Sequence, residues 1–265
     1  ATVDIAFQAA FACITAAIVG GSLAGRMKFG AFATFITIWI LLIYAPLAHM
    51  VWGGDGSFIG DQIGALDFAG GDVVHISSGL TGLVLCLLLG KRRISWMIVE
   101  TIKTGKPTLV GAATGLVAGL VVITPAAGFV EPWASIVMGL IVSPVCYFAI
   151  SFCKAKIGYD DALDAFGCHC VGGIVGGILT GIFCVPELSW TDFGGLIYTG
   201  DPTLLGAQCL GILVTIVFVA VGSLIIGLIV KAIFGGLRVT KEEEAAGMDM
   251  TAHSESAYPA FIGLD

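Results

Sequence analysis

The chain has 265 residues, of which 57% are hydrophobic and 12% charged, with a formal net charge of -7 and a mean hydropathy of +1.01. These values lie outside the range of soluble domains and indicate a membrane protein. Apolar runs long enough to cross a bilayer recur along the whole sequence, so a single N-terminal signal peptide does not explain them.

The apolar runs predict seven membrane-spanning helices and a polar tail. The short alternating segments that a β-barrel needs are missing from the sequence, so we expect an all-α fold, a polytopic helical bundle. The predicted spans cover residues 4–25, 30–52, 72–90, 108–127, 130–153, 166–184 and 203–234. A shorter piece, 94–104, contains Glu100 and Lys103 and predicts half a span or an interfacial helix. Residues 1–235 are expected to form the transmembrane domain and 236–265 a cytoplasmic tail.

The positions of lysine and arginine predict how the chain is oriented, because short cytoplasmic loops retain these residues. They fall at Arg26 and Lys28, at 91–93, at 103–106, at 154–156 and from Lys231 onward. The loops 53–71, 128–131 and 185–202 contain none. We therefore expect the first residue on the outer side of a cell membrane and the tail in the cytoplasm, where it is available to cytosolic partners.

The eight cysteines mostly lie within or at the ends of the predicted spans. There they serve most simply as small apolar packing residues. The alternative is a soft-metal site at Cys168–His169–Cys170, but consecutive helical side chains point about 100° apart and cannot close on one ion without other ligands. We therefore expect no metal and no cofactor.

Two segments share a spacing of aspartate, histidine and glycine. The first, "DFAGGDVVHISSGLTG", begins at Asp67 and contains His75, and the second, "DALDAFGCHCVGGIVG", begins at Asp161 and contains His169. In each segment the histidine follows the aspartate by eight residues, and glycines follow the histidine by four and seven. The predicted orientation runs the first segment inward and the second outward. This pattern is typical of an inverted structural repeat.

The same spacing predicts that the two histidines meet. Eight helical residues, at about 1.5 Å each, carry each imidazole about 12 Å from its membrane face toward the middle of a hydrocarbon core of about 30 Å. An ionisable side chain at that depth indicates function, and the alternative is a pair that only packs. Desolvation favours neutral imidazole, which has one donor and one acceptor. Such a pair suits water, ammonia or a proton better than a bare metal cation.

The expected outer end of the bundle contains aromatic residues and no basic ones. Phe7 and Phe11 lie on one helical face with Gln8 beside them, and Trp52 lies at the end of the second span. Aromatic faces near acidic loops attract cations, by about 2 kcal/mol when both are desolvated. Trp52 alone is equally typical of an aromatic belt at the membrane interface.

Together these segments resemble the ammonium transporters of the Amt/MEP/Rh family, nearest to the bacterial and archaeal members. The resemblance covers nearly the whole chain, in the family's order. It rests on "AFQAAFACITAAIVGGSLAGRMKF", "PLAHMVWGG", "GALDFAGGDVVHISSG", "GKPTLVGAATGLVAGLVVITPAAGFV", "DDALDAFGCHCVGGIVGGILTGIF" and the tail "MDMTAHSESAYP".

The resemblance implies a role for each candidate residue. His75 and His169 match the family's twin histidines, which line the pore and pass ammonia and its separated proton. Phe11 matches a gate phenylalanine, and Trp52 matches the aromatic of the outer ammonium recruitment site. Phe7 and Gln8 match residues around the same entrance. Asp67 matches the buried acidic residue that organises the recruitment site. The resemblance also implies a homotrimer with one pore per subunit. It further implies that a PII-family signalling protein meets the tail at the cytoplasmic face.

The chain departs from the family in its number of spans. Family members have eleven, whereas this chain starts at what resembles the third and passes from "LLLGKRR" into the inner end of the seventh. The sixth span normally carries the second gate phenylalanine and the recruitment serine, which therefore have no counterpart here. We hypothesise that the sequence is part of a longer polypeptide. An intact mass near 27.3 kDa would instead mean a real deletion, with no closed pore expected.

The sequence therefore predicts a membrane ammonium transporter and not an enzyme. Ammonium is gathered outside, loses its water and a proton, and crosses as ammonia and a proton along a route lined by histidine. An ammonium sensor that signals through the tail is the alternative, and a soft-metal transporter that uses the cysteines is a third reading. The sequence leaves open whether net transport moves charge.

Overall fold

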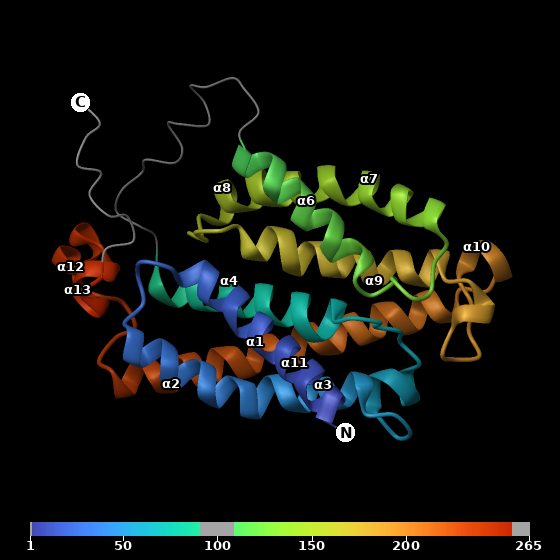
Figure 1. Ribbon diagram of the computed structural model, residues 1–265, viewed down its shortest axis with the longest axis horizontal. Helices are drawn as coiled ribbons and strands as arrows, with labels where there is room; N and C mark the ends of the chain where they lie inside the picture. Colours follow the sequence, from blue (N-terminus) through green and yellow to red (C-terminus); the bar gives the residue numbers. More distant parts are fainter. Residues whose placement is uncertain (1, 91–108, 256–265) are drawn as a thin grey trace.

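The computed structural model describes residues 2–90 and 109–255, and the described part is built from helices and loops (Figure 1). Its elements are α1 (Thr2–Leu23), α2 (Phe29–Trp39), η1 (Ile40–Tyr44), α3 (Ala45–Trp52), η2 (Phe58–Ile63), η3 (Gly71–Ile76), α4 (Ser77–Leu89), α6 (Leu109–Ile123), α7 (Pro132–Phe148), η4 (Ala149–Cys153), α8 (Lys154–Ile157), η5 (Phe166–Cys170), α9 (Val171–Phe183), η6 (Pro186–Leu188), α10 (Leu196–Thr199), α11 (Thr203–Ile233), α12 (Lys241–Ala246) and α13 (Met248–His253). The expected all-α polytopic bundle is confirmed.

Within the described residues, six helical stretches have the length and composition to cross a membrane. They are Val3–Leu23, Phe29–Trp52, Gly71–Leu89, Pro132–Phe152, Phe166–Phe183 and Thr203–Ile233, and each lies within a few residues of a predicted span. The span predicted at 108–127 is shorter as a helix, because Pro125 disfavours helical backbone at the residue before it and α6 ends at Ile123. The half span predicted at 94–104 lies outside the described residues.

The two segments with the repeated spacing fold alike. Each begins with a short π-helical turn, η3 or η5, and continues as a 13-residue α-helix, α4 or α9. Each histidine is the penultimate residue of its π-helical turn. The helices α4 and α9 run in opposite directions through the centre of the bundle, with α1 and α11 packed against α4 (Figure 1). Of the helices able to span a membrane, these two bury the largest share of their residues.

Glycines allow these central elements to approach closely. A Cβ on Gly79 of α4 would lie 2.6 Å from the backbone nitrogen of Cys170, and a Cβ on Gly173 of α9 would lie 2.9 Å from the carbonyl oxygen of Gly71. Side chains larger than hydrogen would force the two segments apart. Small residues play this role in membrane bundles, where apolar lipid gives little hydrophobic drive between helices.

The tail folds back on one end of the bundle, at the left in Figure 1. The backbone of Met27 forms an antiparallel bridge with that of Arg238, and the N–H of Val239 donates to the carbonyl of Arg26 at 2.9 Å. Thr240 caps α12 through a reciprocal capping box with Glu243. The ring of His253 in α13 lies edge-on to Phe29, with centroids 5.1 Å apart. We call this the tail end and the opposite end, which carries α10, the vestibule end.

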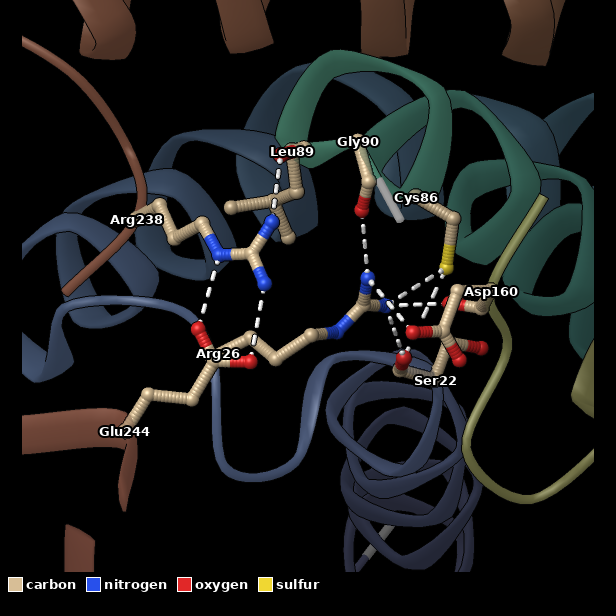
Figure 2. A network of polar contacts seen from close by, with 8 residues as sticks. All are labelled: Ser22, Arg26, Cys86, Leu89, Gly90, Asp160, Arg238 and Glu244. Carbon is tan, nitrogen blue, oxygen red and sulfur yellow. Dashed lines mark hydrogen bonds and ion pairs between the residues drawn. The ribbon is translucent and has the colours of Figure 1, made fainter. Parts of the chain in front are cut away.

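Arg26 joins several elements at the tail end. Its buried guanidinium donates to the carbonyl oxygens of Gly90 at 2.8 Å and Ser22 at 3.0 Å, and also to the carbonyl of Asp160 and the sulfur of Cys86. Figure 2 shows these contacts from α1, the end of α4 and the loop before η5 converging on one side chain. The neighbouring Arg238 pairs with Glu244 of α12, at 2.8 Å (Figure 2).

Candidate functional site

The two imidazoles predicted to meet do so. The Nδ1 atoms of His75 and His169 lie 3.0 Å apart, a hydrogen-bonding distance, and the ring planes differ by 16°. Because one histidine comes from η3 and the other from η5, the pair joins the two repeated segments. On its other edge, Nε2 of His75 lies 3.2 Å from the hydroxyl oxygen of Thr124, the residue that follows α6.

Asp67 caps the helix that carries His75. One carboxylate oxygen accepts from the backbone N–H groups of Gly70 and Gly71, both at 2.7 Å, and the other from those of Asp72 at 2.8 Å and Val73 at 3.3 Å. These are the N–H groups that a helix leaves without partners at its start. Burial raises the pKa of the Asp67 carboxyl, and the four hydrogen bonds oppose that rise.

The tight turn between Asp67 and η3 depends on glycine. Gly70 has φ of +108°, a backbone conformation that a side chain disfavours, and it immediately precedes η3. Asp161 makes a comparable contact ahead of His169, because its carboxylate accepts from the N–H of Phe166 at 2.8 Å. In both segments a carboxylate therefore accepts from the N–H five residues later.

Asp67 also connects the histidine helix to the aromatic residues of the vestibule end. The indole N–H of Trp52 donates to the carbonyl oxygen of Asp67 at 2.7 Å. The ring of Trp52 lies 5.6 Å from that of Phe11, which in turn lies 4.9 Å from that of Phe7, both with edge-on geometry. A continuous series of contacts therefore runs from the aromatic rings through Asp67 to η3.

A pocket of about 660 Å³ opens beside these rings. Five of the predicted site residues line it, namely Phe7, Gln8, Phe11, Trp52 and Asp67, together with the acidic residues Asp55, Asp61 and Asp192. No lysine or arginine of the described residues lines it. Aromatic faces and carboxylates in a pocket without basic side chains favour a small cation. His75 and His169 do not line this pocket, so the predicted residues form two groups joined through Asp67.

Sequence reasoning missed three contributors to this region. Gln208 of α11 is buried, and its amide accepts from the N–H of Leu66 at 2.7 Å and donates to the carbonyl oxygens of Leu66 and Gly177. It thereby fixes the loop that presents Asp67. Trp190 also lines the pocket, with its ring 5.5 Å from that of Phe68. Thr124 was missed as a partner of His75, and its only sequence signal is its place before a proline.

The geometry around Cys168, His169 and Cys170 does not support the alternative of a soft-metal site. Cys168 and Cys170 are buried on either side of His169 in η5. Among the side chains that the structure describes, no three of histidine, cysteine, aspartate or glutamate gather as a metal site would require. The imidazole of His169 is directed to His75 instead.

Comparison with known proteins gives a consistent result. The model of the Ammonium Transporter Family matches residues 1–95 and 93–258, in two pieces that meet where the sequence resemblance loses spans. The ammonium transporter of Bacillus subtilis is 43% identical over 95% of this chain and 74% of its own length. That of Aquifex aeolicus is 41% identical over 97% of this chain and 72% of its own length.

Solved structures share the fold. Saccharomyces cerevisiae Mep2 superimposes with a TM-score of 0.77 at 29% identity, covering 89% of this chain and 66% of that one. A structure named Sensor Amt Protein gives a TM-score of 0.79 over 92% of this chain and 75% of that one, at 22% identity, which is a likeness of fold alone. The chain therefore spans about two thirds to three quarters of the length of the relatives it matches.

Proposed function

The chain belongs to the Ammonium Transporter Family, and we propose that it transports ammonium across a membrane. Ammonium is taken from the outer solution into the pocket at the vestibule end, loses a proton, and crosses as ammonia and a proton past His75 and His169. Phe11 gates the passage, and Trp52 contacts the cation, with Phe7 and Gln8 at the entrance. Asp67 holds Trp52 and η3 in fixed positions relative to each other. Apart from this proton transfer, the route makes and breaks no covalent bond.

The observation that carries the proposal is the connection of two chemically distinct places. The pocket offers aromatic faces and carboxylates, which suit a cation, and the histidine pair offers neutral nitrogens, which suit ammonia and a proton. Asp67 contacts both through Trp52 and the N–H groups of η3. Ammonium suits both places, because it is a small cation that becomes a neutral hydrogen-bonding molecule by losing one proton.

The proposal extends to topology and assembly. Residues 1–235 form the membrane domain with the vestibule end outside, residues 236–265 form the cytoplasmic tail, and three copies assemble with one pore each. Arg26, Lys28 and Arg238 gather at the tail end, which supports placing it in the cytoplasm. There α12 and α13 would meet a PII-family protein, which ties transport to nitrogen metabolism.

The test is the transient current of proteoliposomes on an ammonium jump, with potassium as the control cation. We expect a current specific to ammonium that His75→Ala abolishes or makes less selective, because the substitution removes half of the nitrogen pair. His49→Ala is the matched control, since His49 is exposed on α3 and lies outside both groups. An equal current carried by potassium, or full selectivity in His75→Ala, would reject the proposed route.

An ammonium sensor remains the second candidate, favoured by the contacts of the tail with the bundle, from Val239 to Arg26 and from His253 of α13 to Phe29. A sensor would change the binding of a cytosolic partner to the tail on addition of ammonium without moving ammonium. A flux assay that detects internal pH separates this outcome from electroneutral passage of ammonia, which also gives no current.

A further inference from the structure

The histidine pair belongs to a longer hydrogen-bonded series that begins on α6. The hydroxyl oxygen of Thr124 lies 2.8 Å from the carbonyl oxygen of Leu120 and 3.2 Å from Nε2 of His75. His75 in turn meets His169 through the two Nδ1 atoms, 3.0 Å apart. A carbonyl, a hydroxyl and two imidazoles are thus joined by three consecutive hydrogen bonds.

The end of α6 decides where the hydroxyl proton of Thr124 lies. The backbone N–H of Thr124 donates to Val121 at 3.2 Å, one residue short of the usual α-helical partner Leu120. The Leu120 carbonyl therefore lacks that N–H, and the Thr124 hydroxyl supplies the donor. A carbonyl oxygen can only accept, and a hydroxyl has one proton. The Thr124 oxygen must then accept from an N–H at Nε2 of His75.

This assignment orders the whole pair. A neutral imidazole carries one proton, so His75 with its proton on Nε2 has a lone pair on Nδ1. The Nδ1 of His169 must donate to that lone pair, which leaves Nε2 of His169 unprotonated. In the described part of the chain, no protein group hydrogen-bonds to this Nε2.

We propose that Thr124 is a positioning residue that fixes the tautomers of the histidine pair, so that Nε2 of His169 is its free basic nitrogen. This inference rests on the proposed function and names the atom that first takes the proton. An N–H bond of ammonium breaks, the proton bonds to Nε2 of His169, and ammonia leaves. His75 offers no lone pair for this step, because its only one faces His169.

The surroundings of Thr124 hold it in place. The N–H of Ala69 donates to the Thr124 carbonyl at 3.2 Å, and that of Phe68 donates to the Pro125 carbonyl at 3.1 Å. A Cβ on Gly71 would lie 2.7 Å from Cβ of Pro125, so only glycine allows η3 to pack this closely on the turn. The turn that carries Thr124 is therefore attached to the loop between Asp67 and η3, which fixes its distance to His75.

The test uses solid-state nitrogen NMR on the reconstituted chain labelled with ¹⁵N-histidine. His49→Gln and His253→Gln remove the two histidines outside the pair, and a pH of about 8 keeps imidazole neutral. We expect protonated Nε2 and bare Nδ1 at His75, with the reverse at His169. If Nδ1 is instead the protonated nitrogen of His75 and Nε2 that of His169, while Thr124 is unchanged, the proposal is overturned.

Two variants of Thr124 test its part. Thr124→Val removes the acceptor oxygen with little change in shape, so we expect the opposite tautomer order to gain about tenfold in relative population. Thr124→Ser keeps the hydroxyl and should keep the original order. An unchanged tautomer ratio in Thr124→Val would overturn the role of Thr124. The NMR measurement does not depend on transport. If the expected tautomers are found but the same liposomes transport no ammonium, the proposed function is rejected and the assignment of the tautomers stands.

Discussion

At the scale of single residues, Asp67 shows how one side chain can serve two parts of a site. Its carboxylate satisfies four N–H groups at the start of η3, and its carbonyl accepts from Trp52. Asp67 is 3% exposed, so these protein groups replace the water that would otherwise solvate its carboxylate. Its charge therefore acts on the position of η3 and, through the backbone, on the position of Trp52.

We predict that Asp67→Asn destabilises the protein although it keeps the size of the side chain. The amide nitrogen would replace an oxygen that accepts two hydrogen bonds and would face two N–H donors. The expected loss is at least about 2 kcal/mol, measured as a lower unfolding temperature in detergent, with loss of the ammonium current. Asp61→Asn is the stability control, because Asp61 is exposed and accepts one bond from Gly56. Equal unfolding temperatures for the two variants would contradict the capping role.

At the scale of elements, the position of the histidines depends on how closely η3–α4 and η5–α9 approach. Gly173 of α9 packs closely on η3, because a Cβ there would lie 2.9 Å from the Gly71 carbonyl oxygen and 3.3 Å from Cβ of His75. Contacts this short leave no room for a methyl group. The distance between the two imidazoles is therefore set by the backbone of both segments.

We predict that Gly173→Ala costs about 1–3 kcal/mol and lowers the ammonium current, because η3 must move away from α9. Gly119→Ala in α6 is the matched control. Nothing lies within 4 Å of a Cβ at Gly119, so alanine there should leave stability unchanged or raise it by up to about 1 kcal/mol. Thermal unfolding of both variants in the same detergent gives the comparison. A Gly173→Ala protein as stable and active as Gly119→Ala would show that the close approach is unimportant.

At the scale of the whole molecule, Arg26 connects parts that lie far apart in the sequence. Its side chain joins α1 to Gly90 at the end of α4 and to Asp160 before η5, and its carbonyl accepts from Val239 in the tail. One fully buried guanidinium therefore links both histidine-bearing segments at the end opposite to the vestibule. Arg238, which is partly exposed, pairs with Glu244 of α12 and lies 3.5 Å from the carbonyl oxygen of Leu89 at the end of α4 (Figure 2).

We predict that Arg26→Met lowers stability by about 3–5 kcal/mol, because it leaves a buried network without its cation. Arg238→Met should change stability by less than about 1 kcal/mol, since its pair with Glu244 is partly exposed. Limited proteolysis should instead cut the tail of Arg238→Met faster. If both variants unfold at the same temperature, Arg26 does not hold the bundle together.

The sequence by itself determined the all-α membrane fold, six of the seven predicted spans and the two histidine segments, because length, hydropathy and an eight-residue spacing are local properties of the chain. It also indicated Phe7, Gln8, Phe11, Trp52 and Asp67, which line the pocket at the vestibule end. The tertiary structure alone decided that Gln208 fixes the loop at Leu66, that Arg26 joins three elements, and that Thr124 contacts His75. These contacts join residues 49 to 142 positions apart, so no periodicity or motif could show them. They depend on how closely the glycine-rich elements pack, which only the folded chain establishes.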